Sequence, residues 1–110
     1  MTGTRIRILI VDDSVVIRRL IKEILDATTA SRWSAWRTTQ VAVAKVEELK
    51  PDAVTMDIEM PVMNGVDAVK AIRKTHPRLP IVMFSTLTER GASATMDALA
   101  AGASDYVTKP

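Results

Sequence analysis

Short apolar blocks alternate with longer amphipathic stretches along this chain of 110 residues. The clearest block, RIRILIV at Arg5–Val11, is rich in β-branched residues and ends at two aspartates, which is typical of a buried strand. Apolar residues then recur at helical spacing from Val15 to Leu25, with Asp13 or Ser14 as the expected N-cap. Strands that alternate with amphipathic helices form right-handed βαβ units. The sequence therefore predicts an α/β fold around a parallel sheet.

The same alternation continues along the rest of the chain, with one exception. Further strands are expected at Ala53–Met56, Ile81–Phe84 and Asp105–Val107, and further helices at Val41–Lys50, Gly65–Thr75 and Glu89–Ala101. The segment Thr28–Thr39 (TTASRWSAWRTT) shows neither strand alternation nor a helical stripe, although a strand should lie there between two helices. We expect that second strand to be shortened or poorly ordered.

Charge and composition exclude several classes of function. The formal net charge is +2 and the basic residues are scattered, so we expect no nucleic-acid partner. The chain has no cysteine, and hence neither a disulfide framework nor a thiolate metal site. Its first apolar run ends in two aspartates and lacks a small-residue cleavage site, so it is not read as a signal peptide. No apolar stretch is long enough to span a bilayer, and we expect a cytoplasmic location without a membrane partner.

Polar residues follow the expected strands at the points where those strands end: Asp12 and Asp13, Asp57, Ser85 and Thr86, and Lys109. In a parallel α/β sheet, ligands bind outside the carboxyl ends of the strands. Three carboxylates at one edge need a compensating cation, and their oxygen atoms suit Mg²⁺. A lysine adds a fixed positive charge, and a hydroxyl can donate to an oxyanion. The set fits phosphoryl transfer to the carboxylate of Asp57, with Mg²⁺ as cofactor.

Each of these residues also has an ordinary structural explanation. Carboxylates after a strand are favoured at a helix N-terminus, a loop aspartate is often solvated, serine and threonine form turns, and a single lysine is most often a surface charge. We expect the one histidine, His76, to have a capping or surface role rather than a catalytic one. The functional interpretation depends on all the polar sites arriving at strand ends in one pattern.

Four motifs resemble the receiver family of response regulators: VDDS at Val11–Ser14, MDIEMPVMNG at Met56–Gly65, FST at Phe84–Thr86 and TKP at Thr108–Pro110. The resemblance covers nearly the whole chain except Thr28–Thr39. It implies a flavodoxin-like five-stranded parallel sheet in the order 2-1-3-4-5, with helices on both faces. It also implies a histidine kinase as the partner that donates the phosphoryl group.

The resemblance assigns a role to each motif residue. Asp57 would be phosphorylated and Lys109 would pair with the phosphoryl group. Mg²⁺ would be held by the carboxylates of Asp12, Asp13 and Asp57 and the backbone carbonyl of Glu59, with Asp13 favoured over Asp12 as the direct ligand of the acidic pair. Ser85, Thr86 and Tyr106 would act as switch residues, and Pro61 and Gly65 would shape the loop after Asp57.

A narrower resemblance concerns the runs TMDIEMP and STLTERGA, which are similar to the regulatory domain of the chemotaxis protein-glutamate methylesterase. That family continues into a fifth helix and a C-terminal hydrolase domain, which removes methyl esters from chemoreceptor glutamates. We therefore expect residues 1–110 to form a single receiver domain, truncated before its fifth helix and without independent enzymatic activity. Its effector would be the attached hydrolase or another protein.

Two other functions remain open. The chain could be a stand-alone receiver that serves as a protein-docking module. It could also be a Mg²⁺-dependent phosphatase of related architecture, in which Glu59, two residues after Asp57, would act as general acid. Turnover of a generic phosphomonoester would distinguish the phosphatase from a receiver.

The unassigned segment has an unusual property at the level of codons. Family relatives carry a strand resembling IEVVGVA there, whereas this chain has both of its tryptophans, Trp33 and Trp36. Codons compatible with Thr29–Arg37, read in the shifted frame, can spell GIEVVGVA. Our hypothesis is that two compensating frameshifts bound roughly residues 27 to 40; ordinary divergence of an edge strand is the alternative. Resequencing of the gene tests it, because codons incompatible with that strand would exclude the hypothesis.

Overall fold

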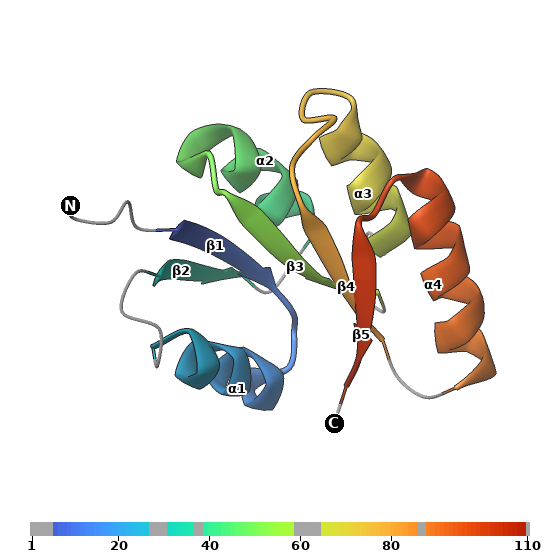
Figure 1. Cartoon of the computed structure of the whole chain (residues 1–110), viewed down its shortest axis with the longest axis horizontal. Coiled ribbons are helices and arrows are strands. Elements are labelled where there is room, and N and C mark those ends of the chain that lie inside the picture. Colours follow the sequence, from blue (N-terminus) through green and yellow to red (C-terminus); the bar gives the residue numbers. More distant parts are fainter. Residues whose placement is uncertain (1–5, 27–30, 37–38, 59–64, 86–87, 110) are drawn as a thin grey trace.

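The computed structural model describes residues 6–26, 31–36, 39–58, 65–85 and 88–109. Within these ranges, strands alternate with helices as the sequence predicts (Figure 1). The strands are β1 (Ile6–Val11), β2 (Ser31–Trp36), β3 (Ala53–Asp57), β4 (Ile81–Ser85) and β5 (Asp105–Thr108). The helices are α1 (Val15–Asp26), α2 (Thr39–Leu49), α3 (Gly65–Arg73) and α4 (Glu89–Ala101).

The strands form one sheet in the order β2-β1-β3-β4-β5, and every neighbouring pair is parallel. This is the order that the resemblance implied, and the α/β class predicted from the sequence is confirmed. Because all strands run the same way, their carboxyl ends lie at one edge of the sheet. The first and third strands of the sequence, β1 and β3, are neighbours at the centre of that sheet.

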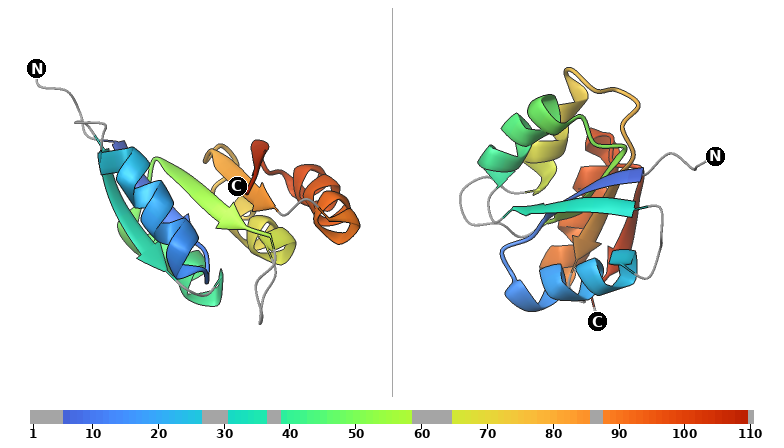
Figure 2. Two further views of the ribbon diagram at one scale, coloured as in Figure 1. Left: turned by 90° about the horizontal axis from the view of Figure 1, so that it is seen from below. Right: turned by 90° about the vertical axis from the view of Figure 1, so that its left-hand side faces the viewer.

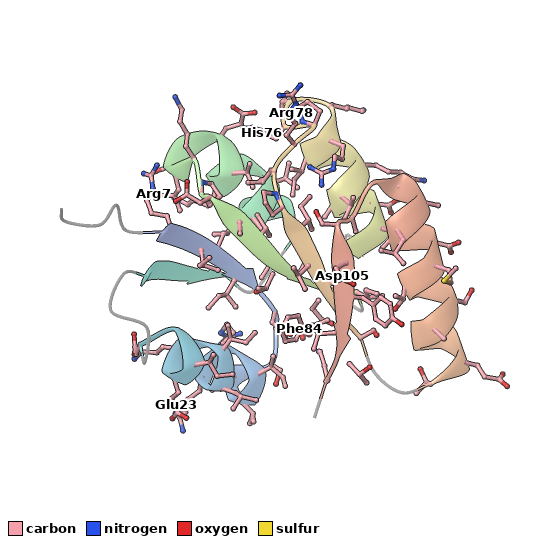
Figure 3. All side chains as sticks on the ribbon, in the orientation of Figure 1. Arg7, Glu23, His76, Arg78, Phe84 and Asp105 are labelled. Carbon is pink, nitrogen blue, oxygen red and sulfur yellow. The ribbon has the colours of Figure 1, made fainter. Side chains whose placement is uncertain are left out.

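The two faces of the sheet are covered unequally. Helices α2, α3 and α4 pack against one face, where the larger buried cluster contains Leu9 and Val11 of β1 together with Val54 and Met56 of β3. Helix α1 lies on the other face, over the β1–β2 end of the sheet (Figure 2). The alternate β1 residue, Ile10, forms the smaller cluster there with Ile17 and Ile21 of α1, and Phe84 of β4 packs against it (Figure 3). Successive strand residues therefore point to opposite faces, as the pleat requires.

The expectation of a shortened second strand is wrong. Strand β2 is as long as β1, at six residues each, and the two pair along their whole length, from Ile6 with Ser31 to Val11 with Trp36. Parallel pairing uses main-chain N–H and C=O groups, which every residue except proline supplies. An edge strand can therefore form from a sequence without apolar alternation, as it does here.

Capping groups define both ends of helix α4. The Thr88 hydroxyl accepts from the Gly91 N–H at 2.9 Å and satisfies one of the free donors of the first turn. Gly102 closes the helix as its C-cap with a left-handed φ of 119°. Other helix ends differ from the sequence-based bounds by two residues or fewer. Within the described ranges, no helix combines the length and apolar character needed to cross a membrane.

Candidate functional site

Three aspartates meet at the carboxyl edge of the sheet. Val11, the last residue of β1, pairs with Met56 of β3, so the residues that follow them, Asp12 and Asp57, come side by side. With Asp13 they offer carboxylate oxygens that all lie within 4.8 Å of one another. Asp12 is 1% and Asp57 is 3% exposed, whereas Asp13 is open to solvent. The sequence prediction that these carboxylates converge is confirmed.

Asp12 has one oxygen fixed by the protein and one that lacks a hydrogen bond. Its Oδ1 accepts from the Ser14 N–H at 2.8 Å, in the manner of an Asx turn. Its Oδ2 is buried and accepts no hydrogen bond from the described residues. A buried carboxylate oxygen that accepts no hydrogen bond is costly, and a cation ligated by oxygen would satisfy it. The residues present therefore fit a divalent cation such as Mg²⁺.

Lys109 brings the fixed positive charge to this cluster. Its Nζ lies 3.0 Å from Asp57 Oδ1 and 3.3 Å from Asp12 Oδ2. The backbone N–H of Lys109 donates to the Ser85 carbonyl at 2.8 Å, which extends the β4–β5 pairing by one residue and directs the side chain inward. Lys109 compensates one of three negative charges, and a divalent cation would balance the other two.

The pKa of Lys109 reflects two opposing effects. Burial lowers the pKa because it disfavours the charged ammonium. The hydrogen bond to Asp57 and the charges of Asp57 and Asp12 outweigh that effect, and the pKa of Lys109 lies above its ordinary value. The lysine is therefore protonated at neutral pH.

The backbone after Asp57 passes very close to the start of α3. Gly65 donates its N–H to the Ile58 carbonyl at 3.0 Å. A Cβ built on Gly65 would lie 2.6 Å from the Asp57 carbonyl oxygen and 2.8 Å from Met83 Cε, which is closer than atoms can approach without movement. A glycine is required at this position so that α3 can begin directly behind the phosphoacceptor candidate.

An arginine that the sequence analysis did not single out also contacts the site. Arg18, in α1, donates from Nη1 to the Asp12 carbonyl at 2.7 Å. The only signal in the sequence was its position, six residues after Asp12 in the helix that follows the acidic pair. A long side chain that reaches back to a main-chain carbonyl leaves no motif.

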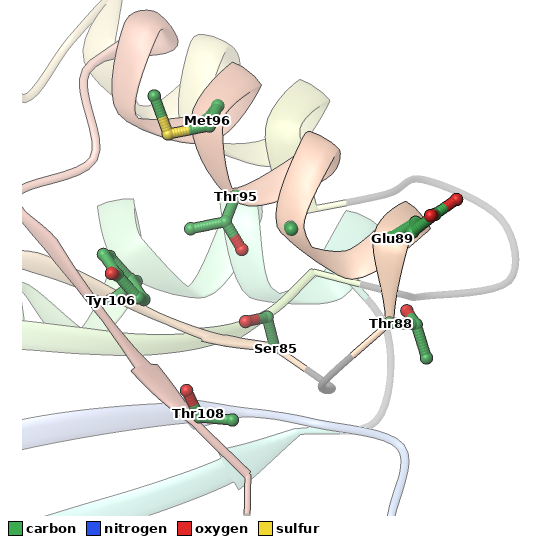
Figure 4. Close-up of a pocket in the computed structure, with 8 residues that line it drawn as sticks. Ser85, Thr88, Glu89, Thr95, Met96, Tyr106 and Thr108 are labelled. Carbon is green, nitrogen blue, oxygen red and sulfur yellow. The ribbon is translucent and has the colours of Figure 1, made fainter.

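Two of the switch candidates, Ser85 and Tyr106, line a pocket between β5 and α4. This pocket measures about 470 Å³, and its walls include Ser85, Tyr106, Thr95 and Met96 (Figure 4). Ser85 is buried beside the acidic site, whereas Tyr106 is 49% exposed. The Thr95 hydroxyl donates to the Gly91 carbonyl at 2.7 Å within its own helix. Ser85 and Tyr106, which are far apart in the sequence, therefore share one cavity.

Some predicted residues lie elsewhere. Glu59, Pro61 and Thr86 fall outside the described residues. His76 lies with Arg78 at the turn before β4, at the far end of that strand from Phe84 (Figure 3). Its Nδ1 is 2.8 Å from Thr75 Oγ1 and 3.5 Å from Glu47 Oε1. The histidine is thus remote from the carboxylates.

Comparisons with known proteins place this arrangement in a family. The sequence model of the response regulator receiver domain matches residues 8–110. A protein-glutamate methylesterase/protein-glutamine glutaminase from a Nocardioides species is 58% identical over 106 residues, which cover 96% of this chain and 29% of that protein. The chain thus spans less than a third of the length of this relative.

Solved structures agree with the sequence comparison. The response regulator domain of Thermotoga maritima CheB matches with a TM-score of 0.84 and 46% identity, over 96% of this chain and 79% of that one. The receiver domain of the Pseudomonas aeruginosa sensor histidine kinase PA1611, solved with a magnesium ion in its active site cleft, matches with a TM-score of 0.85 and 29% identity, over 97% and 87%. With its sheet order, its acidic cluster and a family match over residues 8–110, the chain belongs to the response regulator receiver domain family.

Proposed function

We propose that this receiver domain accepts a phosphoryl group from a histidine kinase on Asp57, in the presence of Mg²⁺, and thereby switches an attached or partner effector. The observation that carries the proposal is the convergence of Asp57 with two further carboxylates and Lys109 at one sheet edge. A buried carboxylate, a cation and a lysine are the groups that phosphoryl transfer to an aspartate requires.

The transfer step balances without any further reactant. An oxygen of the Asp57 carboxylate forms a bond to phosphorus while the bond from phosphorus to the donor imidazole nitrogen breaks. The electron pair of the broken bond stays with that nitrogen. The kinase imidazole is left neutral, with one proton on its ring. Lys109 Nζ, already 3.0 Å from Asp57 Oδ1, is placed to pair with a phosphoryl oxygen as charge moves onto Asp57.

Asp12, Asp13 and Asp57 are the described residues that would hold the cation, together with the backbone carbonyl of Glu59 in the proposed ligand set. Mg²⁺ would supply positive charge that neutralises the phosphoryl oxygens. The magnesium ion in the cleft of the PA1611 receiver supports this choice of metal for a site in the same fold. The buried Oδ2 of Asp12, which accepts no hydrogen bond from the described residues, supports it from this chain's own residues.

The proposed switch links the site to the pocket beside it. The Ser85 hydroxyl, or that of Thr86, would donate to a phosphoryl oxygen and draw the loop after β4 toward Asp57. Tyr106, which lines the same pocket as Ser85, would then turn inward from its half-exposed position. The surface formed by α4 and β5 would change shape, and an effector that contacts it would respond.

We further propose that the effector is a methylesterase. Support comes from the relatives named protein-glutamate methylesterase, of which the Nocardioides protein is 58% identical to this chain. In the full-length protein, acetyl phosphate and Mg²⁺ should accelerate hydrolysis of receptor methyl esters, and Asp57→Asn should abolish the acceleration while basal hydrolysis remains. A full-length protein whose hydrolysis ignores acetyl phosphate would refute this assignment and favour a receiver that docks a separate target.

Binding of the phosphoryl mimic beryllofluoride tests the site itself. We expect ¹⁹F NMR to show bound fluoride resonances only when Mg²⁺ is present, and Asp57→Asn to remove them. Asp97→Asn, at an exposed position of α4 outside the acidic cluster, is the matched control and should leave them unchanged. Bound resonances that persist in Asp57→Asn, or their absence from folded wild-type protein, would contradict the proposal.

A further inference from the structure

We propose that Arg18 is a positioning residue for the cation site. It ties the main chain at Asp12 to helix α1 and thereby sets how the Asp12 carboxylate is presented to a divalent cation. The inference rests on the proposed magnesium-dependent phosphoryl transfer; Arg18 lies outside the set of aspartates, Lys109 and switch residues to which that proposal assigns roles.

The tie joins the end of β1 to the first turn of α1. Arg18 Nη1 donates to the Asp12 carbonyl at 2.7 Å, a short distance for a hydrogen bond from a guanidinium. Arg18 itself is fixed in the helix, because its backbone N–H donates to the Ser14 carbonyl at 3.0 Å. The side chain is only partly exposed, so the bond forms in a site where water competes less well.

This tie acts on the carboxylate through the main chain. Asp12 is held at its carbonyl by Arg18 and at Oδ1 by the Ser14 N–H at 2.8 Å. With two points fixed, the remaining oxygen, Oδ2, is directed toward Lys109 Nζ at 3.3 Å and is left without a hydrogen bond. Loss of the first anchor would free the Asp12 main chain, and with it the direction of Oδ2.

Arg18 could influence a cation in two ways with opposite signs. Its positive charge would repel Mg²⁺, so removal of that charge alone would tighten binding. Charge interactions at solvent-exposed sites change a binding constant by a factor of about five at most, and the Arg18 side chain is still partly exposed to solvent. Groups that orient a metal ligand typically alter metal affinity about 10- to 100-fold. Because the guanidinium bonds directly to the residue that carries a candidate ligand, we infer that positioning outweighs repulsion.

The test measures Mg²⁺ affinity of the intact chain by calorimetric titration and, separately, unfolding in urea without Mg²⁺. Arg18→Met removes the charge and the hydrogen bond but keeps most of the apolar stem, and we expect it to weaken Mg²⁺ binding about tenfold. Arg18→Lys keeps the charge and a single donor, and should give an intermediate affinity. Arg19→Met is the matched control, because Arg19 is the next residue of α1 and is exposed; its affinity should equal that of wild type.

The outcomes separate this inference from the proposed function. Unchanged or tighter Mg²⁺ binding in Arg18→Met would overturn the positioning role while the metal site of the wild type stands. A variant that loses stability without Mg²⁺ yet binds Mg²⁺ with wild-type affinity would show that Arg18 is only structural. If Arg18→Met does not fold, the affinity of Arg18→Lys decides. Absence of Mg²⁺ binding in the wild type would overturn the proposed function itself.

Discussion

Lys109 Nζ lies 3.0 Å from Asp57 Oδ1. Asp57 is the last residue of β3 and Lys109 directly follows β5, and these two strands are separated in the sheet by β4. The lysine reaches across the end of β4 because its main chain is held to Ser85 and its side chain turns inward. The ammonium group that pairs with Asp57 therefore comes from the opposite side of β4. This relationship makes Lys109 both a partner of the buried carboxylates and a candidate partner of the phosphoryl group.

Replacement of Lys109 by methionine should destabilise the domain in the absence of Mg²⁺. Asp57 and Asp12 would keep their buried negative charges and lose the ammonium that compensates them, a change that costs about 3 kcal/mol for a buried ion pair. Urea unfolding at neutral pH measures the loss. The same substitution in an Asp57→Asn background should cost clearly less, and equal losses in both backgrounds would exclude the pairing as the cause.

The same ion pair predicts a dependence of stability on alkaline pH. The pKa of Lys109 is raised in the folded state, so folding keeps a proton that the unfolded chain releases at the ordinary lysine pKa of 10.5. The stability that the pair contributes is complete below that pH and is lost as the pH rises through the higher folded value. Unfolding free energies measured between about pH 8 and about pH 12 should therefore fall more steeply for wild type than for Lys109→Met. Parallel curves would contradict the shift.

Mutual repulsion of the aspartates predicts opposite effects of Asp13→Asn with and without Mg²⁺. Without the cation, loss of one negative charge from the exposed edge of the cluster should raise stability by up to about 1 kcal/mol. With Mg²⁺ at a hundred times its dissociation constant for the wild type, the wild type should gain about 2.7 kcal/mol of stability, and the variant, which binds Mg²⁺ more weakly, should gain less. Thermal unfolding with and without Mg²⁺ measures both effects. Asp97→Asn should follow the wild type in both conditions.

A methyl group at Gly65 should disturb both the fold and the site. The Cβ of Gly65→Ala would meet the Asp57 carbonyl at 2.6 Å, and the shift needed to relieve that clash should cost about 1–3 kcal/mol and weaken beryllofluoride binding. Gly102→Ala is the matched control, because its cost comes from a φ of 119° at the C-cap of α4, before β5 begins. Both variants should unfold at a lower urea concentration than the wild type, but only Gly65→Ala should bind beryllofluoride more weakly. Normal binding in a destabilised Gly65→Ala would show that the close approach is purely structural.

Most of the fold could be predicted because its local signals agree with its global order. The β-branched run before Asp12 and the helical spacing after it specify β1 and α1, and Thr88 and Gly102 are standard caps for α4. β2 could not be predicted with the right length. Its residues lack the alternation that marks a half-buried strand, and its pairing with β1 depends on main-chain groups that are the same for every sequence.

The sequence could predict only those site residues that lie at the end of a strand or directly after it. Asp12, Asp57 and Lys109 meet because the parallel register brings the ends of β1, β3 and β5 to one edge. The contact between Arg18 and the Asp12 carbonyl could not be foreseen, because it depends on the path of a long side chain and not on register. The close approach of Gly65 to Asp57 likewise appears only once the packing of α3 is known.

Covalent phosphorylation of Asp57 tests the central claim most directly. The chain would be incubated with acetyl phosphate and Mg²⁺, and intact-mass spectrometry followed by peptide mapping would locate any adduct. We expect a single phosphoryl group on Asp57, dependent on Mg²⁺, absent from Asp57→Asn and present in Asp97→Asn. A chain that is folded by circular dichroism and takes up no phosphoryl group, or takes it up equally in Asp57→Asn, would contradict the claim that Asp57 is the phosphoacceptor.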